Sequence, residues 1–340
     1  MLIRFATTSE KCYNSSMLDN KKMGIVAKIA LFAATIIWGS SFFIFKVALN
    51  DAPPCYVLMV RFGIGSILLS LVFIKKFKNL TLDCVWKGAL TGVFLALAYI
   101  SQTIGLEHTT PGKNAFLTAV YCVMVPFMMW AVTKNRPDKF NLISAFLGII
   151  GIGLVSIDGD FSFNFMGDGM TLVGGVFFAI HIIAIAVLGK DKDPMLFTIM
   201  QLMSCALVMV IGHFAFETTP ESISVPSILG ISYLTVIGTA LAMFFMNFGI
   251  QYTTANTSSL IMSLEAVFGV LFSIIFYKEE LTVKIGIGFL IIFIAVVISE
   301  TKLSFLKKKV KLADATIVSE EITQNNDEKQ EENEQPKEEI

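Results

Sequence analysis

The chain has 340 residues, of which 55% are hydrophobic and 16% are charged, and its formal net charge is −1. Soluble proteins usually carry about 25% charged residues, so this composition excludes an ordinary soluble protein and indicates a membrane protein. The charges gather at the two ends and in short clusters between long apolar runs. We expect the lipid bilayer as a partner and no nucleic acid.

Residues 1–24 are mixed and polar, and basic side chains precede the first apolar run. That run, 25–49, is longer than the core of a signal peptide and has no small-residue cleavage site. We therefore expect a cytoplasmic N-terminal segment followed by an uncleaved first helix.

Apolar runs that approach or exceed the roughly 20 residues of a membrane-crossing helix recur along the chain. They are too long for membrane strands of about ten residues, and they lack the alternation of such strands. The sequence predicts an all-α membrane protein with ten transmembrane helices, at residues 25–49, 56–74, 86–106, 113–133, 141–157, 169–189, 195–214, 227–250, 257–277 and 283–299.

The predicted helices fall into two sets of five that resemble each other. A shift of 144 positions lays Ala98–Phe127 on the first part of Ala242–Glu280, aligning Gly105 with Gly249 and one Thr-Thr pair with another. Because five is odd, the second copy enters the membrane from the opposite side. This predicts two inverted five-helix repeats.

We expect the repeats at 25–157 and 169–300, joined by an exterior linker at 158–168. In secondary transporters, inverted repeats place the substrate site near the membrane midplane, between the halves. The alternative is that the repeat records a gene duplication in another kind of helical membrane protein.

Orientation follows from the basic residues in the loops, which favour the cytoplasmic side. With the N-terminus inside, both termini are cytoplasmic and the protein is a multi-pass protein of the cell (inner or plasma) membrane. The interior loops then hold nine basic residues and the exterior loops three: Lys75, Lys76, Lys78, Lys87, Lys134, Arg136, Lys139, Lys190 and Lys192, against Lys113, Lys278 and Lys284.

After the last helix the chain is first basic and then strongly acidic, with little apolar content. This composition predicts a disordered cytoplasmic tail over 301–340. Small residues at four-residue spacing, such as Gly88, Gly92 and Ala96, let helices approach closely in lipid. They favour packing within one chain, with a homodimer interface as the alternative.

Three charged residues fall within predicted membrane helices, where a charge costs about 2.5–3.5 kcal/mol at the centre. Lys46 and Arg61 lie near helix ends and either pair with a charge or reach the interface. Glu265 lies about eight residues, or roughly 12 Å, into its helix. We expect Glu265 to couple transport by exchanging a proton for a cationic or zwitterionic substrate; the alternative is a carboxyl that only fixes helix packing.

Polar and aromatic residues on equivalent helices of the two halves are candidates for binding a small-molecule substrate near Glu265. Tyr121 and Glu265 are 144 positions apart and are therefore predicted to be pseudo-symmetric partners. His181 can relay protons, because imidazole titrates near neutral pH; for each residue the alternative is an ordinary interhelical hydrogen bond. The candidates are Trp38, Ser40, Ser41, Gln102, Asn114, Thr118, Tyr121, His181 and Asn247.

Several catalytic signatures are missing from the sequence. It contains no HExxH, no GxxxxGK[ST] and no GxSxG stretch, so it predicts no metal, no cofactor and no catalytic residue. A membrane enzyme or a non-transporting sensor is nevertheless the leading alternative to a transporter.

Five stretches in one order carry a family resemblance. They are WGSSFFIFKVAL (Trp38–Leu49), Pro53–Pro54, VRFGIGSILL (Val60–Leu69), NAFLTAVYCVMVP (Asn114–Pro126) and LEAVFGVLFSIIFYKEELT (Leu264–Thr282). Over about residues 25–300 the chain resembles the EamA family of the drug/metabolite transporter superfamily. The resemblance implies a ten-helix carrier with recurring family residues at Trp38, Lys46, Arg61 and Glu265; Ala266 stands where the family often has proline.

We interpret the chain as a secondary transporter that exports amino acids or related small metabolites by alternating access, driven by protons or by the substrate gradient. Two alternatives stay open. One is an importer or exchanger of an anionic metabolite, such as a nucleotide or cofactor, bound by Lys46 and Arg61. The other is the membrane enzyme or sensor.

Overall fold

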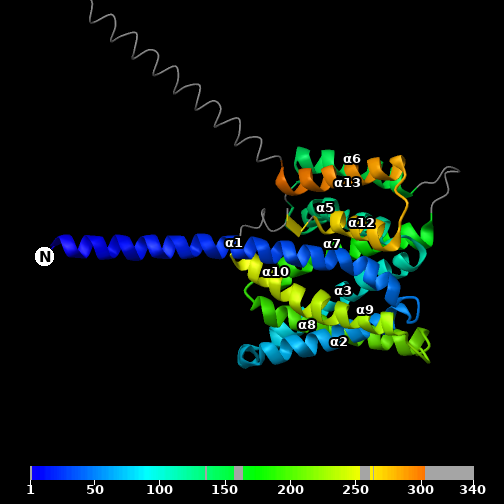
Figure 1. The fold of residues 1–340 in the computed structure, drawn as a ribbon, viewed down its shortest axis with the longest axis horizontal. Helices are drawn as coiled ribbons and strands as arrows, with labels where there is room; N and C mark the ends of the chain where they lie inside the picture. Colours follow the sequence, from blue (N-terminus) through cyan, green and yellow to red (C-terminus); the bar gives the residue numbers. More distant parts are fainter. Residues whose placement is uncertain (1, 135, 157–163, 253–260, 263, 303–340) are drawn as a thin grey trace, which may run out of the picture. The chain divides into compact units, whose positions relative to one another are not determined.

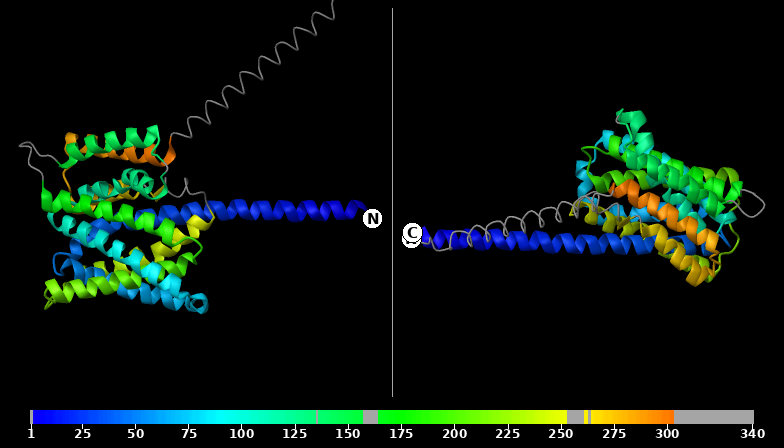
Figure 2. Two further views of the ribbon diagram at one scale, coloured as in Figure 1. Left: turned by 180° about the vertical axis from the view of Figure 1, so that it is seen from behind. Right: turned by 90° about the horizontal axis from the view of Figure 1, so that it is seen from above.

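The computed structural model describes residues 2–134, 136–156, 164–252, 261–262 and 264–302, whose regular secondary structure is helical throughout. Residues 1–300 form one compact unit and residues 301–340 another. Figures 1 and 2 show the helices of the first unit. Beyond Lys302 the predicted tail lies outside the described residues, as does the first part of the predicted linker, 158–163.

The helices follow the predicted apolar runs. In chain order they are α1 (Leu2–Ala48), α2 (Pro54–Val72), the 3₁₀ turn η1 (Ile74–Asn79), α3 (Leu82–His108), α4 (Pro111–Ala119), α5 (Tyr121–Thr133), α6 (Lys139–Ser156), the π turn η2 (Phe165–Gly169), α7 (Met170–Leu188), α8 (Pro194–Phe216), α9 (Val225–Thr235), the π turn η3 (Val236–Leu241), α10 (Ala242–Gln251), α12 (Leu264–Phe272), the π turn η4 (Ser273–Tyr277) and α13 (Val283–Thr301).

Seven helical stretches among the described residues are long and apolar enough to cross a membrane, and three apolar helices, 139–155, 264–277 and 283–299, are shorter. The chain is therefore a multi-pass membrane protein, while a count of ten crossings stays a prediction. The predicted N-terminal segment is helical, because α1 begins at Leu2. Residues 2–23 contain neither glycine nor proline, the strongest helix breakers.

Threonine, aspartate and proline set several helix starts. Thr81 and Thr110 accept hydrogen bonds from the N–H groups three residues later, at the starts of α3 and α4. Asp193 does the same for the first N–H groups of α8, and prolines occupy the first turn of α2, α4, α8 and α9. These residues satisfy or remove N–H groups that have no partner inside a helix.

The helix pairs form matched sets. α3 packs against α7 and α8, while α10 packs against α1 and α9 packs against α1 and α2. α4 and α5 pack against α7, and α12 packs against α1, whereas α2 with α8 and α4 with α12 pair directly. If each of the first five predicted helices is exchanged for its counterpart among the second five, every contact in this set becomes another contact of the set or stays the same.

Two backbone details recur at the 144-residue offset. Lys134 and Lys278 end α5 and η4 with φ of 62° and 56°, the left-handed region. Gly105 and Gly249 both allow close approach, because a Cβ would meet Thr171 Oγ1 at 2.3 Å in one case and Leu31 Cγ at 2.3 Å in the other.

The two largest hydrophobic clusters among the described residues each draw on both halves of the chain. One surrounds Phe62, Leu58 and Leu202, where α2, α3 and α8 meet. The other joins α4 and α5 to α12 and α13, with Phe116 stacked on Phe289 at 4.4 Å. α13 also lies beside α6 (Figure 1), where Gly151 lets the two backbones approach. The predicted repeats therefore do not fold as separate bodies.

Carboxylates connect the two halves where α1 and α3 end and α2 and α4 begin, which we call the α3–α4 end. Asp51 accepts hydrogen bonds from Ser224 and Ser227 at the start of α9. The hydrogen bond from Ser224, and to a lesser extent that from Ser227, holds the pKa of Asp51 below its usual value. Glu217 and Glu279 cap α2 and α4 in the same way, each from the other half.

Exposed ion pairs connect the halves at the opposite end. Lys76 lies 2.6 Å from Asp193, and Lys192 pairs with Asp83. The hydrogen bond with Asp83 raises the pKa of Lys192. Because these charges remain accessible to water, the pairs stabilise the fold little.

Replacing Gly92 by alanine tests the packing of α3 on α8. A Cβ at Gly92 would meet the carbonyl oxygen of Gln201 at 2.4 Å and its Cα at 3.0 Å, both atoms of the α8 backbone. We expect Gly92→Ala to lower the free energy of unfolding by about 1–3 kcal/mol, measured by SDS titration in detergent micelles. The control is Gly63→Ala, whose Cβ would meet only the Ala206 Cβ, at 3.9 Å. Equal losses in both variants would contradict this packing.

Candidate functional site

A cavity of about 220 Å³ lies among α1, α2, α3, α4, α5, α7, α8, α10 and the start of α12. Aromatic and aliphatic side chains make up most of its wall. Among the described residues that line it, Arg61 and Glu265 carry the charges. Mostly apolar walls with a few convergent polar groups are typical of small-molecule sites.

Twelve lining residues form six pairs at the 144-residue offset. The predicted partners Tyr121 and Glu265 are one of these pairs, so the structure brings them to the same space. The others are Trp38 with Ile182, Ser41 with Ile185, Tyr99 with Met243, Gln102 with Met246, and Thr118 with Met262.

The two members of each pair differ in chemistry. The first half contributes aromatic rings, hydroxyls and an amide, whereas the second half contributes isoleucine and methionine side chains and the carboxylate of Glu265. Other lining residues do not follow this division, since Phe42 and Leu95 come from the first half and His181 and Gln201 from the second. The methionines at 243, 246 and 262 pack against the cluster that contains Trp38 and form what we call the methionine wall. Methionine is flexible and polarisable, and it adapts to apolar groups of different shape.

Arg61 is held in place by α2 and by the neighbouring π turn. Its side chain is 4% exposed, and its Nε donates a hydrogen bond of 2.9 Å to Thr239 Oγ1 on η3. Its guanidinium lies 5.1 Å from the ring centre of Tyr99 and 5.2 Å from that of Phe62. The alternative in which Arg61 reaches the membrane interface is therefore wrong: the side chain turns inward to the cavity wall.

Glu265 enters the cavity from the first turn of α12, where α12 crosses α1 closely. Gly39 makes this crossing possible, because a Cβ there would meet Phe268 Cβ at 2.4 Å and the Glu265 carbonyl oxygen at 3.0 Å. The Glu265 carboxyl interacts electrostatically with Arg61, and no hydrogen bond to it is found within the part of the chain that the structure describes. A substrate cation can therefore approach this carboxylate without displacing a protein partner among those residues.

Hydrogen bonds orient the other polar lining groups. His181 Nε2 lies 2.7 Å from Gln201 Oε1, and because an amide oxygen only accepts, this ring nitrogen carries a proton. Gln102 donates to Thr118 Oγ1 at 3.0 Å. Trp38 Nε1 donates to the carbonyl of Gly238 at 2.9 Å.

Four predicted residues do not line the cavity. Asn114 is fully buried and donates to Gln102 O and Thr171 Oγ1, at 3.0 and 2.7 Å. Asn247 donates to the carbonyl one turn before it in α10. Lys46 bonds to the end of α3. Ser40 pairs with Tyr233 at 2.8 Å and likewise lies outside the lining.

Sequence reasoning missed several lining residues. Tyr99, Gln201 and the three methionines 243, 246 and 262 face the cavity. The repeat offset contains the signal for the methionines, since each lies 144 positions after a polar or aromatic residue that lines the cavity. Among the residues that the structure describes, no group of three His, Cys, Asp or Glu side chains can hold a metal ion.

Comparison with known proteins identifies relatives over most of the chain. An uncharacterized transporter of Archaeoglobus fulgidus is 32% identical over 277 residues, covering 81% of this chain and 85% of the relative. The uncharacterized transporter YetK of Bacillus subtilis is 28% identical and covers 86% of this chain and 90% of its own. The uncharacterized inner membrane transporter YedA of Escherichia coli K12 is 24% identical over 63% and 71% of the two chains.

A solved structure and a family profile also match the chain. A crystal structure described only as that of a protein matches with a TM-score of 0.58 and 14% identity, over 82% of this chain and 98% of the other. The profile of the EamA-like transporter family matches twice, at residues 25–157 and 165–301. These two matches cover most of the sequence, and the chain belongs to the EamA-like transporter family.

Proposed function

We propose that this protein is a secondary transporter of the cell membrane that exports amino acids or related small zwitterions by alternating access. The observation that carries the proposal is the mostly apolar cavity in which Arg61 and Glu265 supply opposite charges. Arg61 binds the substrate carboxylate, Glu265 binds its ammonium group, and the methionine wall accommodates an apolar side chain.

We propose that the two halves are inverted repeats, the arrangement on which alternating access depends in this proposal. Three observations favour these repeats. The helix contacts map onto one another when the two sets of five helices are exchanged, six pairs of lining residues share the 144-residue offset, and the family profile matches the chain twice. In transporters built this way, the halves rock around a site at the midplane. Each half then takes the arrangement of the other when the cavity changes side.

The chemistry of the wall separates this proposal from its alternatives. An anionic metabolite would need more cation than carboxylate in the cavity, but Lys46 lies outside the lining and Glu265 would repel an anion. A zwitterion matches both charges at once. The transporter names of the relatives favour transport over an enzyme or a sensor.

Proteoliposome exchange tests the function. Vesicles loaded with amino acids, nucleotides or other metabolites, under an imposed pH gradient, are expected to release amino acids with apolar side chains. Because Glu265 is the proposed proton carrier, Glu265→Gln should abolish the response to the pH gradient while exchange of unlabelled for labelled substrate persists. The control is Glu280→Gln, which should behave as the parent because Glu280 is exposed in the connection between η4 and α13. Movement of nucleotides alone, or an unchanged pH response in Glu265→Gln, would overturn the proposal.

Replacing Arg61 by methionine tests the charge balance of the cavity. It removes the bond to Thr239 and leaves Glu265 without its opposite charge, so we expect a loss of about 2–4 kcal/mol in the free energy of unfolding. In that background Glu265→Gln should recover part of the loss. Both values come from SDS titration of the four proteins of a double-mutant cycle; additivity within about 0.5 kcal/mol would show that the two charges are independent.

A further inference from the structure

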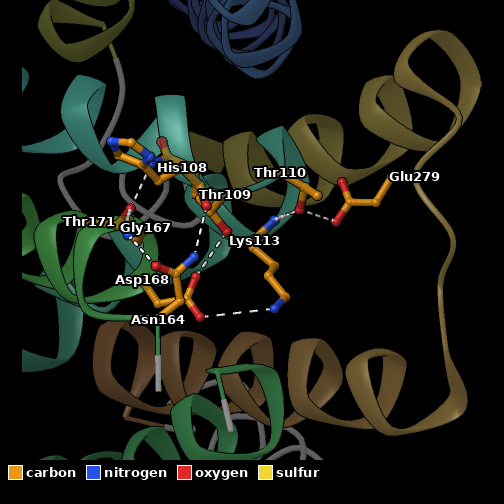
Figure 3. Close-up of polar contacts among 10 residues, drawn as sticks. His108, Thr109, Thr110, Lys113, Asn164, Gly167, Asp168, Thr171 and Glu279 are labelled. Atoms are coloured by element: carbon orange, nitrogen blue, oxygen red, sulfur yellow. Dashed lines mark hydrogen bonds and ion pairs between the residues drawn. The ribbon is translucent and has the colours of Figure 1, made fainter. Parts of the chain in front are cut away.

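The turn between α3 and α4, residues 106–113, is held by side chains from three other elements. Figure 3 shows two of these attachments, from η2 and from the connection between η4 and α13. The third comes from Lys46 near the end of α1.

Lys46 uses all three hydrogens of its ammonium group on this turn. Its Nζ donates to the carbonyls of Leu106, Glu107 and Thr109, at 2.5, 2.8 and 3.1 Å. The first two carbonyls belong to the last turn of α3, where they have no partner inside the helix, and the third belongs to the residue that follows α3. A positive charge at a helix C-terminus is also favoured by the helix dipole. One side chain thus fastens the end of α1 to the end of α3.

η2 holds the turn from a second side. Asn164 Nδ2 donates to the His108 carbonyl at 2.8 Å, and Thr109 Oγ1 donates to Asp168 Oδ1 at 2.9 Å. Lys113 Nζ lies 3.9 Å from the other oxygen of Asp168, which is fully buried (Figure 3). These contacts join the first half of the chain to the start of α7 in the second half.

Glu279 holds the turn from a third side. It accepts hydrogen bonds from Thr110 Oγ1, from Ser273 Oγ and, at 3.0 Å, from the N–H of Gly112. A Cβ at Gly112 would lie 2.6 Å from Glu279 Oε2, so a larger residue there would displace this carboxylate. The carboxylate therefore caps α4 and fixes it to the end of η4.

The cavity is closed directly beneath this turn. Phe45 and Leu106, which line the cavity next to the Lys46 contacts, are 4% and 3% exposed. The wall is therefore sealed by buried side chains at the α3–α4 end.

We propose that the α3–α4 turn is the gate on this side of the cavity, predicted to be exterior, and that Lys46 is the positioning residue that keeps it closed. Lys46 acts by binding the end of α3 to α1, so that Phe45 and Leu106 stay packed over the cavity. Opening the cavity at this end requires the three hydrogen bonds of Lys46 to break together. The inference deepens the proposed transport function and rests on it.

Cysteine labelling tests the gate without any substrate. Thr103 lines the cavity and is 2% exposed, so Thr103→Cys is the reporter, in a chain whose five native cysteines are replaced by alanine. A membrane-impermeant maleimide is added to intact cells and, separately, to inside-out vesicles. The rate of labelling from each side is compared between the parent, Lys46→Met and Lys46→Arg. Size-exclusion chromatography establishes that each variant is folded.

Lys46→Met should raise the rate of labelling from the exterior about tenfold or more, because hydrogen bonds to a charged group are lost only from the closed state. Lys46→Arg keeps a cation that donates to carbonyls and should label as slowly as the parent. The matched control is Lys190→Met, since Lys190 lies 144 positions after Lys46 and is exposed. It should leave exterior labelling unchanged.

Several results would overturn the gate. They are parental exterior labelling in folded Lys46→Met, an equal rise in Lys190→Met, and a rise confined to the cytoplasmic side. If Lys46→Met does not fold, Glu279→Gln loosens the same turn from another side, and an unchanged exterior rate in it also overturns the proposal. Because labelling needs no substrate, faster labelling in a protein that transports nothing refutes the proposed function and leaves the gate standing.

Discussion

The bilayer requires every backbone polar group to find its partner within the protein, and helix ends are where this requirement is hardest to meet. Here the solution at the α3–α4 end is reciprocal: Asp51, Glu217 and Glu279 each cap a helix of the other half. The hydrogen bonds that hold the halves together are therefore the same ones that satisfy these helix ends. Any motion that separates the halves at this end must exchange those bonds for others.

Most helix positions could be predicted because the apolar runs are long and the loops between them are polar. The breaks inside the runs could not. Val120 separates α4 from α5, and π turns interrupt the helices at 236–241 and 273–277. Gly238 lies within the turn at 236–241, but no glycine or proline occupies Val120 or 273–277, so the sequence does not mark these two breaks. The ten-helix count depends on three short helices, for which length alone does not decide whether they cross.

The site could be predicted in part, because the 144-residue offset picks out helices that meet at the cavity. Trp38, Gln102, Thr118, Tyr121, His181, Arg61 and Glu265 surround it. Asn114 and Asn247 were chosen by the same reasoning but turn toward neighbouring backbone carbonyls. The direction of a side chain depends on the rotation of its helix, which a sequence without clear amphipathic stripes does not contain. The methionine wall could not be predicted, because apolar residues occur throughout such a chain and do not mark a site.

The pairing of Tyr121 with Glu265 has a consequence for how such a protein is made from one chain. Two identical subunits arranged antiparallel would place the same residue on both sides of the space, so a single acid would always face its own copy. Two carboxylates brought together repel each other and share protons. A duplicated and fused chain escapes this, because each half mutates alone. Under the proposed symmetry, such a chain can keep an acid at one position and a phenol at the equivalent position, so that the described lining carries one carboxylate.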